Sequence, residues 1–194
     1  MATNKLTNYI SIYDDIFGNK KNKILYKLLN NNFFSFEEGM IFDREGDQKV
    51  DKEIRSTKYC NLGNLNTNNN TLIHWANLFA SCLQYHINKY SHENNTNSHS
   101  KVLDIQILKY ELGGFYRQHV DSGHSAPRTL SFIYLVNDDY EGGELIFNLP
   151  KEDETFKIFP KKDRLLVWPS NFLYPHKVEP VRKGVKYSVV SWAL

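Results

Sequence analysis

The chain has 194 residues, of which 41% are hydrophobic and 14% are aromatic. This length fits one domain, and this much apolar material excludes a wholly disordered protein. Apolar runs are short, as at 165–168, so no membrane-spanning segment is expected. The 24 basic and 22 acidic side chains leave a net charge of +2, which argues against nucleic acid or an anionic membrane as the partner.

The two cysteines, Cys60 and Cys82, are too few for a disulfide framework or for a zinc site with four ligands. Residues 1–15 combine neither an apolar core nor a small-residue cleavage site, so no secretory signal is expected. These features together predict a cytoplasmic protein whose thiols are reduced.

Helical spacing of apolar residues dominates the N-terminal half. Residues 24–29 and 72–85 each carry apolar side chains three and four positions apart, which predicts two helices lying on a core. Residues 9–13 predict a strand ahead of the first helix. Residues 43–58 are charged and lack an apolar period, so they predict a mobile, solvated loop. We expect residues 1–95 to form a helical and loop region that supports the rest of the chain.

From Val102 onward the pattern changes to short strands separated by glycine and proline. So many short strands in one half of the chain favour a sandwich or a jelly roll over a parallel sheet with crossover helices. We therefore predict a single domain, 1–194, that is mainly β with flanking α, in which a jelly-roll core over 102–193 is buttressed by the N-terminal helices. The predicted strands are 102–110, 129–136, 144–147, 156–159, 164–168, 177–180 and 185–192.

Three side chains in the strand-rich half could hold one metal ion together. His119 and Asp121 stand two positions apart, so on a strand both would point to the same face. His176 follows in the same half. Two histidines and one carboxylate on one face of an octahedral ion are the ligand set of non-haem Fe(II) oxygenases. A His-x-Asp pair by itself also occurs on ordinary exposed strands, so the assignment depends on the residues around it.

A basic residue and two hydroxyl groups in the same half suit a carboxylate ligand. Lys186 comes ten residues after His176, and Ser188 lies on the same strand face as Lys186. Together they could hold a carboxylate by charge and hydrogen bonding. Tyr110, nine residues before His119, could donate from its phenol to the same carboxylate. Each residue alone is also compatible with an ordinary strand position.

The order of these motifs resembles one enzyme family. The run YELGGFYRQHVD over 110–121 resembles the metal-binding segment of the prolyl 4-hydroxylase-like 2-oxoglutarate/Fe(II) dioxygenases. The runs RTLSFIYLVN over 128–137 and YEGGEL over 140–145 resemble the segments that follow it in the family. The tail over 169–192 matches in kind and spacing. The resemblance covers about 102–193, half of the chain.

This resemblance implies a double-stranded β-helix and a role for each matching residue. His119, Asp121 and His176 resemble the iron ligands. Lys186 resembles the basic residue that holds the distal carboxylate of 2-oxoglutarate, and Ser188 would add its hydroxyl. The other implied cosubstrate contacts are Tyr110, Ser131 and Trp192, and a tight turn between core strands is implied at Gly142 and Gly143.

The resemblance also implies the cofactors and the reaction. Fe(II), 2-oxoglutarate and O2 are implied, with ascorbate as a supporting reductant, and the products are a hydroxylated substrate, succinate and CO2. The implied substrate is a peptidyl residue, proline first. A loop over 36–60 is implied to close over it, with Arg55 and Arg117 as candidate substrate contacts. We expect no nucleic-acid or membrane partner, and a monomer or homodimer.

Two alternatives stay open at this stage. Within the same enzyme class, the substrate is a free amino acid or another small metabolite. From a different class, the chain is a catalytically silent jelly-roll or cupin-type module that only binds a metal. The joint presence of His119, Asp121, His176 and Lys186 favours an enzyme, because a silent module has no need of all four.

Overall fold

The computed structural model describes residues 5–42, 46–62, 68–96, 101–124, 126–150 and 155–194. Its helical elements are a 3-10 helix η1 (Leu6–Tyr9), α1 (Gly18–Asn30) and α2 (Asn70–Glu93). The strands that precede α2 are β1 (Ser11–Asp14), β2 (Glu37–Glu38), β3 (Ile41–Phe42), β4 (Gln48–Lys49), β5 (Arg55–Ser56) and β6 (Lys58–Asn61). The strands that follow it are β7 (Val102–Tyr110), β8 (Phe115–His119), β9 (Leu130–Leu135), β10 (Glu141–Gly142), β11 (Leu145–Phe147), β12 (Phe156–Ile158), β13 (Arg164–Pro169), β14 (His176–Val178), β15 (Val181–Lys183) and β16 (Lys186–Ala193).

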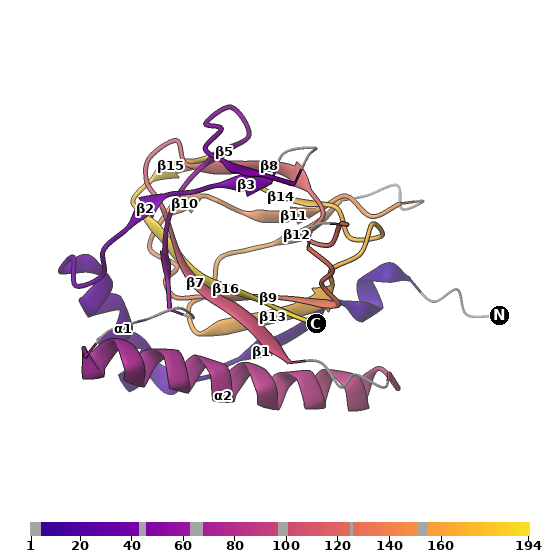
Figure 1. The fold of residues 1–194 in the computed structure, drawn as a ribbon, viewed down its shortest axis with the longest axis horizontal. Coiled ribbons are helices and arrows are strands. Elements are labelled where there is room, and N and C mark those ends of the chain that lie inside the picture. The colour runs from indigo at the N-terminus through magenta and orange to yellow at the C-terminus, as the bar shows by residue number, and fades with distance from the viewer. Residues whose placement is uncertain (1–4, 43–45, 63–67, 97–100, 125, 151–154) are drawn as a thin grey trace.

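Two antiparallel sheets form the body of the molecule. The larger has seven strands in the order β1-β13-β9-β16-β7-β6-β2, and the smaller has five in the order β12-β11-β14-β8-β5. Figure 1 shows the smaller sheet above the larger one, with α2 running beneath the larger one. Two short pairings, β10 with β15 and β3 with β4, complete the described strands. The site discussed below lies between the two sheets.

The helices cover the outer face of the seven-stranded sheet. The side chain of Asn69 starts α2, because it accepts hydrogen bonds from the amides of Thr71 (3.0 Å) and Leu72 (3.4 Å). Alternate strand residues such as Ile107 and Tyr134 point toward the helices. The buried side chains that α1 and α2 contribute to this contact are Leu25, Leu29, Trp75, Phe79, Leu83, Ile87 and Tyr90.

The other face of the larger sheet packs against the smaller sheet. On β9, Ile133 and Leu135 face this interior while their neighbours Phe132 and Tyr134 face the helices. This alternation places one apolar cluster between the sheets, and its buried members include Leu108, Tyr110, Leu145, Phe147, Ile158, Leu166, Trp168 and Val178. The predicted mainly β fold with supporting N-terminal helices is therefore confirmed.

The predicted strands of the C-terminal half are present with nearly the predicted bounds. The prediction for 177–180 is shifted, because β14 begins at His176 and a separate strand, β15, follows. Strand β8 is absent from the predicted set, although the argument for the metal ligands assumed that His119 lies on a strand. Strands β10 and β15 are also absent from the predicted set. They pair with each other across a register shift, and neither shows a regular alternation of apolar and polar residues in the sequence.

The prediction of a solvated loop over 43–58 is wrong for the part that the structure describes. Within it, β4 pairs with β3, and β5 pairs with β8 beside the metal ligands. Thr57 is buried, and its hydroxyl donates to the carbonyl of Lys109 (3.1 Å). The high charge of this segment did not exclude strands, because a short strand at a sheet edge can keep its polar side chains in solvent while its backbone is paired.

The described helices include none that is long and apolar enough to cross a membrane. Cys60 and Cys82 are both free, on β6 and α2 respectively. Burial raises the pKa of both thiols, to about 12 for Cys82. They are therefore weak nucleophiles at neutral pH, as expected of structural cysteines.

Candidate metal centre

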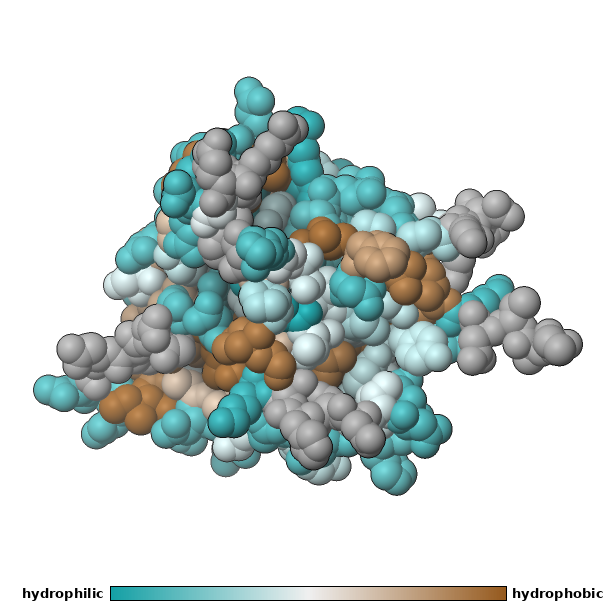
Figure 2. All heavy atoms as spheres, turned by 45° about the vertical axis from the view of Figure 1, so that its right-hand side comes forward, coloured by the Kyte–Doolittle hydropathy of each residue, from teal (hydrophilic) through white to brown (hydrophobic). Residues whose placement is uncertain are grey.

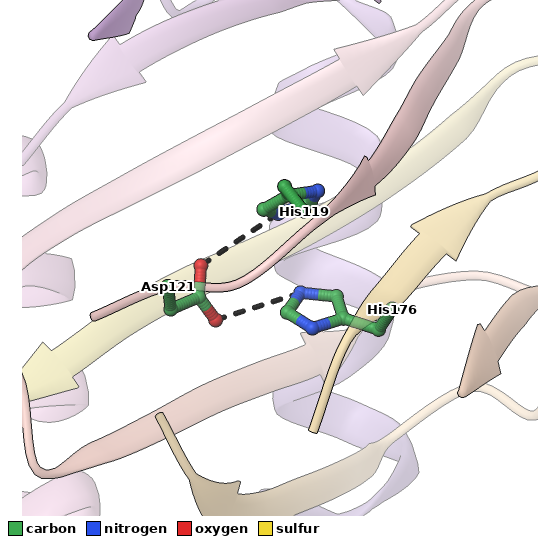
Figure 3. A group of neighbouring side chains, drawn as sticks. All are labelled: His119, Asp121 and His176. Atoms are coloured by element: carbon green, nitrogen blue, oxygen red, sulfur yellow. Dashed lines mark ion pairs between the residues drawn. The ribbon is translucent and has the colours of Figure 1, made fainter. Parts of the chain in front are cut away.

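Three potential metal ligands converge between the two sheets. His119 ends β8, Asp121 follows it two residues later, and His176 opens the neighbouring strand β14, directly opposite His119 in the ladder. One ligand atom from each lies within 4.8 Å of the others. Figure 3 shows the carboxylate of Asp121 between the two imidazoles, with Oδ1 3.7 Å from His119 Nε2 and Oδ2 3.5 Å from His176 Nε2.

Backbone carbonyls orient both imidazole rings. Nδ1 of His119 donates to the carbonyl of Arg117 (2.8 Å), and Nδ1 of His176 donates to the carbonyl of Tyr174 (3.0 Å). Since a carbonyl can only accept, each Nδ1 carries the proton, and each Nε2 presents its lone pair toward Asp121. This is the tautomer that a metal ion requires.

The charges at the centre favour metal binding over protonation. Burial, together with the neighbouring His176, pushes the pKa of His119 well below its ordinary value, so this ring is neutral at physiological pH. Burial acts to raise the pKa of Asp121, but the two histidines, the Ser131 hydroxyl and Arg128 outweigh it and lower that pKa. The centre therefore combines a carboxylate with imidazole lone pairs, the donor set typical of Fe(II).

Two serines and an arginine fix the position of Asp121 through hydrogen bonds to its carboxylate, to each other and to its backbone. Ser131 Oγ donates to Asp121 Oδ2 (2.7 Å), and Ser170 Oγ lies 2.7 Å from the same Ser131 hydroxyl. Arg128 Nη1 donates to the Asp121 carbonyl oxygen (3.2 Å), and its guanidinium lies 3.6 Å from the ring centre of Trp192. The carboxylate is thus held directly by Ser131 of β9 and indirectly by Ser170, which follows β13, while Arg128 holds the Asp121 backbone.

The ligands face a cavity of about 300 Å³ between the sheets. Its inner wall is apolar, with Leu108, Ile133 and Leu145 among the lining residues, and its outer wall carries polar side chains such as Gln106 and Asp104. Aromatic rings pack around the imidazoles. Other lining residues are Met40, Arg55, Tyr59, Asn61, Tyr110, Tyr116, Arg128, Trp168, Val178 and Trp192.

Two of the residues predicted to bind a carboxylate lie deeper than the cavity. Lys186 is fully buried, and its Nζ donates to the Gly143 carbonyl (2.8 Å) and lies 5.2 Å from the ring centre of Tyr110. Burial lowers the pKa of Lys186 to about 7. Ser188 Oγ is buried, and it has no hydrogen-bond partner among the described residues. Tyr110 itself lines the cavity.

The remaining predicted residues occupy three different environments. Trp192 lines the cavity beneath Arg128, whereas Ser131 contacts the ligand Asp121 directly. Arg55 lines the cavity, with its guanidinium 4.9 Å from the Tyr116 ring centre and Nη1 donating to the Met40 carbonyl (2.8 Å). Arg117 is exposed and is not among the residues that line the cavity, since it alternates with the inward-facing Tyr116.

Several contributors were not singled out from the sequence. Ser170 and Trp168 lie on or beside β13, and Trp168 meets the His176 ring edge to face at 5.2 Å. Tyr116 stacks on His119, with ring centres 3.7 Å apart. The period of two along β7 carries a signal for its inward-facing set, because alternate residues of a strand share a face. In β8 a register shift separates Tyr116 from His119, so the same period does not point to Tyr116. No comparable local signal exists for Ser170.

The family model described as the 2OG-Fe(II) oxygenase superfamily matches residues 105–194, which include all three ligands. The match covers a little under half of the chain, and over these residues the chain is similar to that superfamily. The predicted resemblance to prolyl 4-hydroxylase-like 2-oxoglutarate/Fe(II) oxygenases is confirmed, and the superfamily name supplies the cofactors Fe(II), 2-oxoglutarate and O2.

Individual proteins resemble the chain to different extents. A PKHD-type hydroxylase of Gloeothece citriformis is 33% identical over 98 residues, which cover 47% of this chain and 43% of that protein. The match thus spans less than half of the curated relative. A prolyl hydroxylase of Trichoplax adhaerens, solved with a hypoxia inducible factor peptide fragment, has a TM-score of 0.76 at 23% identity and covers 97% of this chain and 84% of that one.

A second solved structure extends the likeness in fold. A prolyl-4-hydroxylase of Pseudomonas putida has a TM-score of 0.72 at 15% identity and covers 95% of this chain and 91% of that one. The two facing sheets described above are accordingly the jelly-roll core that was predicted.

The residues present fit both implied groups. Two Nε2 lone pairs and a carboxylate supply three ligands to Fe(II) and leave the cavity side open for others. Deeper in the fold, Lys186 has a carbonyl but no acidic side chain as its hydrogen-bond partner, and Ser188 Oγ has none among the described residues. A buried ammonium and an unpaired hydroxyl suit the carboxylate of 2-oxoglutarate.

Proposed function

We propose that the chain is a 2-oxoglutarate- and Fe(II)-dependent dioxygenase that hydroxylates a peptidyl residue, with proline as the first choice. In the overall reaction one C–H bond of the substrate becomes C–OH, and 2-oxoglutarate is converted to succinate and CO2. O2 is consumed, with one of its atoms in the new hydroxyl and the other in succinate. Bound Fe(II) supplies the redox chemistry that activates O2.

The protein's contribution is to hold the reactants in place. His119, Asp121 and His176 would hold the iron through one face, and the carbonyl-bound Nδ1 atoms keep the two rings oriented. Lys186, Ser188 and Tyr110 would hold the distal carboxylate of 2-oxoglutarate. To bind this carboxylate, Lys186 Nζ must give up its hydrogen bond to the Gly143 carbonyl and donate to the carboxylate instead.

The cavity would hold the residue to be hydroxylated next to the metal. Its apolar inner wall suits an uncharged ring such as that of proline, and it excludes water from the reacting atoms. Two comparisons support a peptide substrate: the prolyl hydroxylase of Trichoplax adhaerens was solved with a peptide fragment, and the curated relatives are PKHD-type hydroxylases. The two free thiols support a reducing compartment, and we propose the cytoplasm.

The observation that carries the proposal is the convergence of two correctly oriented imidazoles and one carboxylate on an enclosed cavity. The first experiment is therefore an anaerobic titration with Fe(II) and 2-oxoglutarate, followed by the visible charge-transfer band of the complex. The wild-type protein and His74→Ala should form the complex, and His176→Ala should not. His74 is a matched control because it is an exposed histidine on α2.

The second experiment identifies the substrate class. Proline-containing peptides and free amino acids are offered separately, and succinate release is compared with the gain of one oxygen atom by mass spectrometry. A hydroxylated peptide supports the proposal. Hydroxylation confined to free amino acids would show that the substrate is a small metabolite and not a peptide. A protein that binds Fe(II) but releases no succinate above the His176→Ala background with any substrate would be a silent metal-binding module.

A further inference from the structure

Strand β7 carries a bulge at Asp104, at the outer end of the cavity. Ser191 of β16 pairs with Ile105, but the next residue, Trp192, pairs with Leu103. Asp104 is therefore the extra residue, which has no partner on β16. Bulges of this kind redirect a side chain and are frequent beside active sites.

At this bulge an exposed carboxylate, that of Asp104, lies on the wall of the metal cavity. Asp104 and Gln106 both line it, on the inward-facing side of β7. Within the described residues, the Asp104 carboxylate forms no ion pair, whereas Glu111, just beyond the other end of β7, pairs with Lys58 and Lys109. Burial raises the pKa of Tyr59 and lowers that of Arg128, and the Asp104 charge adds to the first shift and opposes the second.

The two arginines that line the cavity each contact neutral groups. Arg128 donates to the Asp121 carbonyl and lies on the face of Trp192. Arg55 is held by the Met40 carbonyl and by the ring of Tyr116. Both guanidinium groups are thus anchored by neutral partners, and the Asp104 carboxylate stays available to a group that enters from solvent.

The outer wall of the cavity carries polar side chains, among them Asp104 and Gln106. On the face shown in Figure 2, apolar side chains form separate patches between polar ones. Charge and hydrogen bonding are therefore the properties by which the outer wall can distinguish one peptide from another.

We propose that Asp104 is a specificity-determining residue that selects peptides with a cationic side chain, lysine or arginine, close to the residue that is hydroxylated. The inference rests on the proposed peptide hydroxylation and deepens it. The acceptor residue would occupy the apolar inner part of the cavity, while the cation of a flanking residue reaches the carboxylate at the bulge.

The test compares three proline-centred peptides that differ only in one flanking residue, which is Lys, Ala or Glu. Each flanking position on either side is tried in turn. Binding is measured by fluorescence anisotropy of labelled peptide to the full chain with Fe(II) and 2-oxoglutarate under argon, and turnover is measured separately in air. The variants are Asp104→Asn, Asp104→Lys and the control Asp15→Asn. Asp15 is an exposed acid in the turn between β1 and α1, on the helical side of the larger sheet.

For the wild type and Asp15→Asn, we expect the Lys peptide to bind about twofold to fivefold more tightly than the Ala peptide at one flanking position, and the Glu peptide to bind more weakly still. Asp104→Asn should bind the three peptides with equal affinity, and Asp104→Lys should bind the Glu peptide most tightly and the Lys peptide most weakly. The preference should shrink as salt is added, because the pair is exposed.

Three results would overturn the inference. One is equal binding of the three peptides by the wild type at every flanking position. Another is a uniform loss of affinity for all three in Asp104→Asn, which would mean that the carboxylate acts only by orienting Arg128. The third is no binding of any peptide. The proposed function is judged separately: charge-ordered binding without hydroxylation would remove the hydroxylase assignment and keep the role of Asp104.

Discussion

Ser131 Oγ lies 2.7 Å from Asp121 Oδ2 and 2.7 Å from Ser170 Oγ. The hydroxyl has a single proton, and the carboxylate can only accept, so Ser131 donates to Asp121 and accepts from Ser170. Ser131 was predicted as a cosubstrate contact. In the structure its contact is with a metal ligand, and it links that ligand to β13.

Ser131→Ala should therefore weaken metal binding. Loss of the hydrogen bond frees Asp121 to rotate and raises the pKa of its carboxyl group, and outer-shell partners of this type typically change metal affinity about 10-fold to 100-fold. Binding of Fe(II) or Co(II) can be followed by quenching of Trp168, which lies 5.2 Å from the His176 ring. Ser191→Ala is the control, because that buried serine donates to the Leu103 carbonyl instead. Equal affinity in the two variants would contradict a supporting role for Ser131.

Lys186→Ala should weaken binding of 2-oxoglutarate and leave binding of Fe(II) almost unchanged. Truncating one member of a buried charge pair typically costs on the order of 2–5 kcal/mol, or roughly 30-fold to several thousand-fold in affinity. Lys186→Arg should recover part of the binding, limited by the longer side chain in a fully buried position. Isothermal titration of each protein with 2-oxoglutarate and with metal tests both statements. Unchanged cosubstrate affinity in the Ala variant would assign the carboxylate to another cation.

Lys186 should also make the stability of the cosubstrate-free protein depend on pH. Burial lowers the pKa of its amine from 10.5 to about 7 in the folded chain. Between these values the unfolded chain holds a proton that the folded chain has lost, so the free energy of unfolding rises with pH. Below pH 7 the amine is protonated in both states and this dependence disappears.

The comparison with Lys186→Met isolates this effect, since other groups titrate alike in the two proteins. The difference in unfolding free energy should move in favour of the wild type by on the order of 1.4 kcal/mol for each pH unit above 7. Urea unfolding of both proteins at several pH values between 7 and 9 measures it. Parallel curves would show that the amine keeps one charge state throughout.

Gly142→Ala should destabilise the turn into β11. Gly142 has φ of +80°, and an added Cβ would lie 2.2 Å from the Pro180 carbonyl oxygen. Gly18 also has a positive φ, +74°, but an added Cβ there meets nothing within 4 Å. Gly18→Ala therefore measures backbone strain alone, on the order of 1–2 kcal/mol. The Gly142 variant should lose clearly more than that in urea unfolding, and an equal loss would mean that the turn relaxes freely.

The sequence was most informative where local pattern and chemistry coincide. Alternation and turn residues predicted most strands of the C-terminal half, because a strand with one face in the core must repeat its apolar residues with a period of two. His119, Asp121 and His176 could be named as ligands because the motifs around them resemble, in order, those of the prolyl 4-hydroxylase-like 2-oxoglutarate/Fe(II) dioxygenases. The same reasoning failed at Tyr85, which was assigned to the apolar stripe of α2 but is 63% exposed.

What only the tertiary structure decided depends on pairings between residues far apart in the chain. The charged residues 46–58 looked solvated, yet β5 lies beside the metal ligands because it pairs with β8. In this pairing Arg55 lies opposite Tyr116, which is 61 residues later in the chain. Ser131 donates to Asp121 because β9 of the larger sheet passes close to the end of β8 of the smaller sheet. The bulge at Asp104 exists only in the register of β7 against β16. A local pattern determines which face of a strand is apolar, but the partner and register of that strand are set by the packing of the whole chain.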